Sequence, residues 1–182
     1  MRVGKRTQRR LFKLLIALVI LGLGYVANSR QIQVQPPPQI ASTVSPGYYR
    51  VVSFSDGDTI VVDMDGTSEH IRMIGVDTPE TKDPRKPVQC FGQAASDFTK
   101  QLIGIQPVRL ESDPLSTNRD RYNRLLRYVY LPDGRLVEAE IIRQGYGFAY
   151  TSFPFTKADE FTTYQREARE QNRGLWTSCP QT

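Results

Sequence analysis

Two carboxylates stand where neighbouring β-rich runs of the sequence begin and end. Asp58 follows an Asp56-Gly57 turn signal at the start of one run, and Asp77 comes directly after Val76 at the end of the next. Antiparallel pairing of the two runs would bring these ends together. Two carboxylates, supplemented by backbone carbonyls and water, suit a hard cation such as calcium, which prefers several oxygen ligands. On its own, an Asp-Gly-Asp stretch is more typical of a turn.

Side chains that are able to act on a phosphate ester flank this acidic pair. Glu80 lies three residues after Asp77 on a segment stiffened by Pro79, where it is a candidate general base. Arg72 alternates with apolar neighbours, so its side chain faces away from theirs. Guanidinium groups bind phosphate oxygens in a bidentate manner, and four arginines are clustered further along the chain: Arg119, Arg121, Arg124 and Arg127. Taken singly, each of these residues is also typical of a solvated loop, turn or strand face.

The segments that would position these side chains are mostly short strands. β-rich runs at 48–54, 59–64 and 70–76 are separated by turn signals and predict an antiparallel meander. Apolar residues at helical spacing predict a helix at 90–103. The rest of the pattern predicts strands at 108–111 and 125–131, a helix at 137–144, and a last helix that begins at Thr156, in a capping pattern with Asp159, and stops at Gly174.

Five short strands with a helix inserted after the third predict an α+β fold that is mainly β. One arrangement of this size is a five-stranded Greek-key barrel of the oligonucleotide-binding type (OB-fold), here with about three helices. The chain has 182 residues, and its length leaves room for one such domain, which we place at 48–178.

The first 30 residues have the composition of an export segment. A basic start is followed by an apolar run from Leu14 to Ala27 that contains no charge, and then by small and polar residues. The run is closer in length to a signal-peptide core than to a full membrane span, so we favour cleavage over retention as a membrane anchor. Arg9-Arg10 leaves the twin-arginine route open. Residues 31–47, rich in Gln, Ser and Pro, are predicted to be an extended linker.

Export changes the meaning of Cys90 and Cys179, the only two cysteines of the chain. An oxidising compartment, periplasmic or extracellular, favours a disulfide between them. Two unpaired cysteines are the alternative.

The net charge of +5 does not by itself indicate a nucleic-acid partner. Residues 1–30 hold seven basic residues and no acidic one, so the remainder has 17 basic against 19 acidic residues, a net charge of −2. Any contact with nucleic acid has to come from locally placed arginines.

The acidic and basic residues become informative in combination. The stretch Asp56 to Thr59 (DGDT), followed by Ile71 to Thr81 (IRMIGVDTPET), resembles the staphylococcal nuclease (thermonuclease) family. Asp120 to Leu126 (DRYNRLL) resembles the second signature of that family, and later landmarks extend the resemblance to about residue 176. Asn123 departs from the glycine that is usual in the family, although asparagine also adopts the left-handed backbone conformation.

The resemblance implies a calcium-dependent nuclease that cleaves DNA or RNA with little sequence specificity and leaves 3′-phosphates. It implies calcium ligands at Asp58, Asp77 and the Thr78 carbonyl, and catalytic roles for Arg72, Glu80 and Arg124. Arg121, Tyr122 and Tyr150 are further candidates for contacting the substrate, because aromatic stacking accepts any base. We expect a monomer acting on single-stranded or unstructured nucleic acid, with a membrane contact only through an uncleaved leader.

Two other classes of function are compatible with parts of the sequence. A barrel of this type is able to bind oligonucleotides or oligosaccharides without catalysis. A membrane-tethered interaction domain would account for the leader and the linker. The joint presence of Arg72, Glu80 and Arg124 favours the enzyme over both.

Overall fold

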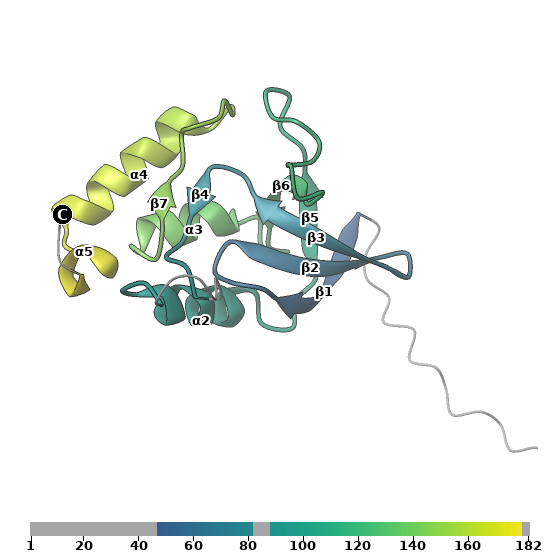
Figure 1. Ribbon diagram of the computed structural model, residues 1–182, viewed down its shortest axis with the longest axis horizontal. Coiled ribbons are helices and arrows are strands. Elements are labelled where there is room, and N and C mark those ends of the chain that lie inside the picture. Colours follow the sequence, from purple (N-terminus) through teal and green to yellow (C-terminus); the bar gives the residue numbers. More distant parts are fainter. Residues whose placement is uncertain (1–46, 82–87, 180–182) are drawn as a thin grey trace, which may run out of the picture. The chain divides into compact units, whose positions relative to one another are not determined.

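Five strands form a closed barrel in the computed structural model, which describes residues 47–81 and 88–179 (Figure 1). The strands are β1 (Tyr48–Phe54), β2 (Thr59–Met64), β3 (Thr67–Met73), β5 (Val108–Glu111) and β6 (Leu125–Tyr130). Their order around the barrel is β1-β2-β3-β6-β5, with β3 and β6 parallel and the other neighbours antiparallel. The predicted five-stranded Greek-key barrel of the OB type is confirmed. The expected leader, and the linker up to residue 46, lie outside the described residues.

The third predicted strand, 70–76, is wrong at both ends. β3 begins at Thr67, because Asp65 and Gly66 both have positive φ (53° and 85°) and form a tight turn directly before it. β3 ends at Met73, because Gly75 turns the chain with a φ of 72° at a place where a Cβ atom would lie 2.5 Å from the Phe155 ring. The rest of the run forms a separate strand, β4 (Val76–Asp77), which pairs with β7 (Phe148–Ala149).

The described part of the chain also contains four helices: α2 (Gly92–Ile103), α3 (Val137–Arg143), α4 (Ala158–Glu170) and α5 (Leu175–Ser178). The predicted capping role of Thr156 is wrong. α4 starts two residues later, and the Thr156 N–H and hydroxyl donate to the Asp113 carboxylate instead. The predicted helices at 90–103 and 137–144 differ from α2 and α3 by two residues and one residue, and α5 was not predicted.

The hydrophobic core fills the barrel and continues beneath α3 and α4. Fully buried side chains from the strands and helices include Ile60, Val62, Ile71, Val108, Val129, Ile141, Ile142 and Phe161. Burial of each such side chain stabilises the fold by about 1.5–3 kcal/mol. In the described residues no helix combines the length and the apolar character that a membrane span requires.

A disulfide joins Cys90, which precedes α2, to Cys179, which follows α5. The predicted bridge is therefore present in the structure. It connects positions 89 residues apart and ties the C-terminal end of the domain to the start of α2.

Candidate active site

The barrel register places Asp58 and Arg72 side by side. Thr59, at the start of β2, is the antiparallel partner of Arg72, near the end of β3. The Asp58 carbonyl also accepts a hydrogen bond from the Met73 N–H at 3.0 Å. The sequence predicted antiparallel pairing of the two runs, and β2 and β3 pair in this way, although β3 ends at Met73 and Asp77 belongs to β4.

Asp58 is a buried carboxylate that accepts four hydrogen bonds or ion pairs. Its Oδ1 accepts from the Thr59 hydroxyl at 3.0 Å and from Arg72 Nε at 3.2 Å. Its Oδ2 accepts from the N–H and the hydroxyl of Thr78 at 2.9 and 3.1 Å. A carboxylate has about four acceptor positions, so these donors occupy all of them.

The turn that precedes Asp58 is packed closely against its neighbours. The Asp56 carboxylate accepts the Asp58 N–H at 3.2 Å, so Asp56 is a turn former. Gly57 allows a close approach to Thr78, because a Cβ atom there would lie 2.8 Å from the Thr78 hydroxyl oxygen. The Thr99 hydroxyl of α2 donates to the Gly57 carbonyl at 2.7 Å. The helix therefore fixes the turn that carries Asp58.

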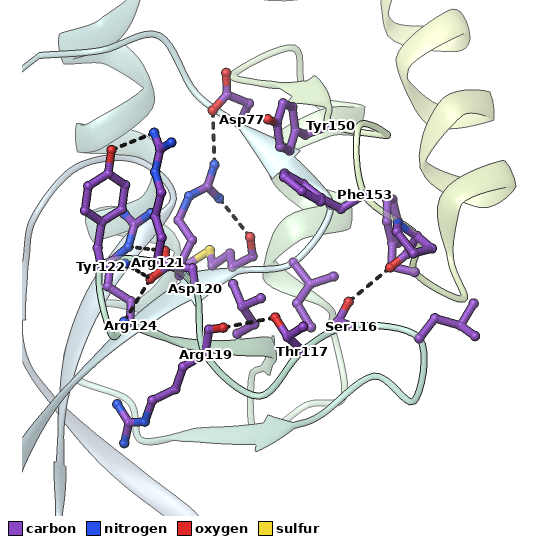
Figure 2. A pocket seen from close by; sticks show the side chains of 18 residues that line it. Asp77, Ser116, Thr117, Arg119, Asp120, Arg121, Tyr122, Arg124, Tyr150 and Phe153 are labelled. Carbon is purple, nitrogen blue, oxygen red and sulfur yellow. Dashed lines mark hydrogen bonds and ion pairs between the residues drawn. The ribbon is translucent and has the colours of Figure 1, made fainter.

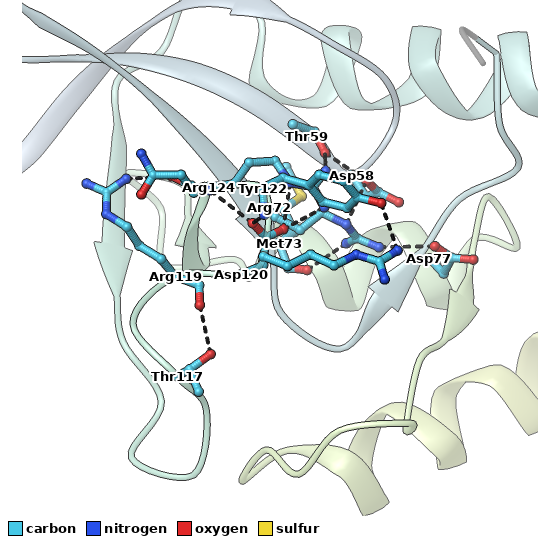
Figure 3. A network of polar contacts seen from close by, with 12 residues as sticks. Asp58, Thr59, Arg72, Met73, Asp77, Thr117, Arg119, Asp120, Tyr122 and Arg124 are labelled. Atoms are coloured by element: carbon cyan, nitrogen blue, oxygen red, sulfur yellow. Dashed lines mark hydrogen bonds and ion pairs between the residues drawn. The ribbon is translucent and has the colours of Figure 1, made fainter. Parts of the chain in front are cut away.

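Arg72 lies between Asp58 and Asp77 and is only 13% exposed (Figure 3). Its Nη2 is 3.0 Å from Asp77 Oδ1, while its Nε faces Asp58. Its Nη1 donates to the carbonyls of Met73 and Val76 at 2.8 and 2.7 Å. These contacts hold the guanidinium at the junction of β3 and β4, where it bridges the two carboxylates.

The acidic side chains here are partly buried and oppose one another's ionisation. Burial, followed by the Asp58 charge, raises the pKa of Asp56 to about 7. Desolvation and the Asp58 charge likewise raise the pKa of Asp77, with a smaller contribution from Glu80, although about half of the Asp77 side chain is exposed. Arg72 lowers both pKa values, but does not cancel the increase. A bound cation would relieve this repulsion.

Arg124 is connected to the same group of residues through Thr59. Its Nε donates to Asp120 Oδ2 at 2.7 Å, and its Nη1 donates to the Thr59 hydroxyl oxygen at 3.3 Å (Figure 3). The Thr59 hydroxyl in turn donates to Asp58. Asn123, directly before Arg124, has a φ of 65°, which confirms that asparagine takes the left-handed conformation here.

A pocket of about 730 Å³ opens beside this network (Figure 2). Of the residues expected to form the site, those that line it are Arg72, Asp77, Arg121, Tyr122, Arg124 and Tyr150. Tyr122 is 63% exposed, and its hydroxyl accepts a hydrogen bond from Arg121 Nη2 at 2.7 Å. Arginines and tyrosines thus line the same pocket, an arrangement suited to phosphate and base contacts.

Asp58, Thr78 and Glu80 are not among the lining residues. The Glu80 N–H donates to Gln89 Oε1 at 2.8 Å, and the Glu80 carboxylate accepts the Thr81 N–H at 2.8 Å. Its charge nevertheless contributes to the raised pKa of Asp77. Within residues 47–81 and 88–179, no three His, Cys, Asp or Glu side chains converge as a metal-binding group.

Comparisons with known proteins agree with this architecture. The family model described as "Staphylococcal nuclease homologue" matches residues 70–178. The thermonuclease of Staphylococcus hyicus is 36% identical over 170 residues, which cover 91% of this chain and 99% of that protein. The chain belongs to the staphylococcal nuclease family. The thermonuclease of Staphylococcus intermedius is 37% identical over 164 residues (90% of this chain, 93% of that protein), and endonuclease YncB of Bacillus subtilis is 40% identical over 124 residues (67% and 58%).

The site of this staphylococcal nuclease family member also contains residues that sequence reasoning missed. Asp113 is a buried carboxylate that accepts the N–H of the pocket residue Leu115, and Leu115 and Phe153 are exposed apolar residues that line the pocket. Nothing local distinguishes Asp113 from an ordinary loop aspartate. The available signal was the Ser152 to Phe155 stretch (SFPF), whose apolar residues fit neither a helical nor a strand period.

Proposed function

We propose that the protein is an exported, calcium-dependent nuclease that hydrolyses phosphodiester bonds of DNA or RNA with little sequence specificity. The observation that carries the proposal is the continuous network from Arg124 through Thr59 and Asp58 to Arg72, beside a pocket that both arginines line. Membership of a nuclease family supports the same activity.

In this mechanism Arg72 and Arg124 bind the oxygens of the scissile phosphate and stabilise the charge of its five-coordinate transition state. Glu80 orients a water molecule and accepts its proton as the water oxygen attacks phosphorus in line. The P–O bond to the 5′ oxygen breaks as the new bond forms. The 5′ oxygen leaves and takes up a proton from solvent, and the phosphate remains on the 3′ side.

The donor set of the site fits calcium, because it consists of oxygens only. The carboxylates of Asp58 and Asp77 and the Thr78 carbonyl would hold the ion, which when bound supplies positive charge to the phosphate. The four acceptor positions of Asp58 are already in use. A cation at Asp58 therefore has to take the place of one donor, and Arg72 is the donor that phosphate binding would also draw away.

The disulfide supports the proposed location outside the cytoplasm, because such bonds persist in oxidising compartments. We retain the proposal of an export leader at 1–30 and a linker at 31–47 ahead of the nuclease domain. The proposed substrate is single-stranded or unstructured nucleic acid, and the proposed working form is a monomer.

Product analysis tests the proposed chemistry directly. The purified protein is incubated with single-stranded DNA and with RNA, in calcium or in excess chelator, and the product ends are identified by mass spectrometry. We expect fragments with 3′-phosphates in calcium and intact substrate in chelator. Fragments with 5′-phosphates, or equal cleavage in chelator, would contradict the proposed mechanism.

A further inference from the structure

Gln89 pairs with both main-chain polar groups of Glu80. The Glu80 N–H donates to Gln89 Oε1 at 2.8 Å, and the Glu80 carbonyl accepts the Gln89 N–H at 3.0 Å. The two residues lie nine positions apart in the sequence. Two hydrogen bonds of normal length to one partner fix the direction of the backbone at Glu80, and with it the point from which the carboxylate extends.

The start of α2 packs against the same stretch of backbone. Gly92, the first residue of the helix, lies so close that a Cβ atom there would be 3.0 Å from the carbonyl oxygens of both Pro79 and Glu80. The Gly92 N–H donates to the Gln89 carbonyl at 3.0 Å. The segment from Gln89 to Gly92 thus connects the proposed general base to the helix.

The disulfide is attached to this connecting segment. Cys90 directly follows Gln89 and is bonded to Cys179, which follows α5. α5 is itself anchored, because Leu175 is buried and its N–H donates to the Gly145 carbonyl at 2.8 Å. The bridge therefore joins the segment that holds Glu80 to a part of the domain that is fixed by other contacts.

We propose that Gln89 and the Cys90–Cys179 bridge position Glu80, so that full nuclease activity requires the oxidised bridge. This role rests on the proposed function, in which Glu80 accepts the proton of the attacking water. Neither Gln89 nor the two cysteines line the pocket, so their effect passes through Glu80. A general base acts only within hydrogen-bond reach of its water, and a displacement of about 1 Å costs on the order of 100-fold in rate.

Reduction of the bridge should therefore slow the cleavage of nucleic acid. A dithiol reductant transfers two electrons and two protons to the bridge, which becomes two thiols while the reductant becomes a disulfide. Cys90 is exposed, so the reductant has access to the bond. As a consequence, the enzyme would be less active in a reducing cytoplasm than in an oxidising compartment outside it.

Steady-state cleavage of single-stranded DNA in calcium tests the positioning role, with the fold of each protein checked by circular dichroism. We expect Gln89→Ala to lower kcat about tenfold with KM unchanged, because the base is displaced while the phosphate contacts remain. The Cys90→Ser, Cys179→Ser double variant and the dithiol-treated wild type should lose about three- to tenfold in kcat. An undiminished kcat in both bridge-free proteins would overturn the part given to the bridge.

Two control variants separate positioning from a general loss of stability. Gln93→Ala removes an exposed glutamine of α2 whose side chain donates to Asp97 of the same helix. Val108→Ala leaves a cavity in the barrel core and lowers the stability of the whole domain. Both controls should keep the wild-type kcat. A kcat for Gln89→Ala equal to that of either control would overturn the positioning role.

A double-mutant cycle with Glu80 shows whether the effect of Gln89 passes through the proposed base. In the Glu80→Gln protein the base is already lost, so the addition of Gln89→Ala should change the residual rate by less than about twofold. A further tenfold loss in this background would mean that Gln89 acts elsewhere, and would overturn its assignment to Glu80.

Hydrogen exchange at the Glu80 amide, measured by NMR without substrate, separates this role from the proposed nuclease activity. Exchange should be about tenfold faster in Gln89→Ala and in the double cysteine variant than in Gln93→Ala, because the acceptor of this N–H is lost or displaced. Faster exchange supports the positioning role even if the wild type cuts no strand and the nuclease proposal fails. Unchanged exchange in both variants would overturn the role, even if the wild type is an active nuclease.

Discussion

Thr78 donates both its backbone N–H and its hydroxyl to the same oxygen of Asp58, at 2.9 and 3.1 Å. Both residues are buried, and they lie 20 positions apart in the sequence. The pair therefore fixes the direction of the Asp58 carboxylate relative to the segment that leads to Glu80. Because Thr78 is also a proposed calcium ligand through its carbonyl, one residue both orients and completes the site.

Replacement of Thr78 by valine should weaken calcium binding while leaving the carbonyl in place. Valine has nearly the same shape but lacks the hydroxyl, so Asp58 loses one hydrogen bond and the folded state loses about 1 kcal/mol. Thr78→Ser, which keeps the hydroxyl, is the control. Calcium titration calorimetry and urea unfolding measure the two effects. Identical values for the valine and serine proteins would show that the hydroxyl has no positioning role.

Arg72→Ala should bind calcium more tightly than the wild type, although it should be inactive as a nuclease. Arg72 occupies acceptor positions of Asp58 and Asp77 that the ion is proposed to use. Its removal eliminates that competition and leaves the carboxylates less neutralised, which we expect to strengthen binding by about three- to tenfold.

Titration calorimetry at pH 8 measures this change. The control is Arg50→Ala. It removes an arginine of β1 that forms an exposed ion pair with Asp63 of β2. Calcium binding by Arg72→Ala that is no tighter than by the control would mean that the ion and Arg72 do not share Asp58.

Much of the fold was predictable because its signals are local. The turn residues and β-rich runs on either side of Asp58 predicted β1 and β2 closely, and the apolar period predicted α2. The break at Gly75 was not predictable, because it depends on Phe155, which lies 80 residues later and occupies the space that a side chain at position 75 would need. Thr156 likewise matched a capping pattern. In the folded protein, however, its N–H and its hydroxyl donate to Asp113, which lies 43 residues earlier in the sequence.

The residues of the candidate site show the same difference between local signals and long-range contacts. Asp58, Arg72, Asp77 and Arg124 were identified from short motifs, and the structure brings them together in one network. Leu115 and Phe153 were not identified, because an apolar residue in a loop carries no chemical signature until its exposure is known. The position of Asp113 depends on contacts with Tyr128 and Thr156 from two other segments, which no local pattern encodes.

Asp113 should make the stability of the domain fall steeply in acid. Burial opposes its ionisation, but hydrogen bonds from Thr156, Tyr128 and Leu115 outweigh burial and lower the pKa to about 2 from 3.8. A lowered pKa stabilises the fold above pH 4, and this stabilisation is lost as the pH falls through 4 toward 2. From the size of the shift, it amounts to about 2 kcal/mol.

Urea unfolding of Asp113→Asn between pH 2 and pH 7 checks this expectation. The variant should be less stable than the wild type by about 2 kcal/mol or more at pH 7, with a difference that shrinks toward pH 2. Asp65→Asn, at an exposed turn position where asparagine also accepts a positive φ, should show no such dependence. A difference that stays constant with pH would contradict the role given to the ionised carboxylate.

Reduction of the Cys90–Cys179 bridge should destabilise the protein without abolishing its fold. The bridge closes a loop of about 90 residues, and the chain-entropy model assigns such a loop a stabilisation of about 4 kcal/mol. The free energy of unfolding is compared between the wild type and a Cys90→Ser, Cys179→Ser double variant. Two reactive thiols in the denatured, unreduced wild type would contradict the bridge.

The most direct test of the central claim is the calcium-dependent rate of single-stranded DNA cleavage by Glu80→Gln and Arg124→Ala. Exposed residues of α4 provide matched controls, Glu170→Gln and Arg166→Ala. We predict that each site variant keeps the wild-type unfolding profile and loses at least about 100-fold in kcat/KM, because it lacks a general base or a transition-state contact. Both controls should retain full activity. Wild-type rates in the purified Glu80→Gln and Arg124→Ala proteins would contradict the assignment of this site as the catalytic centre.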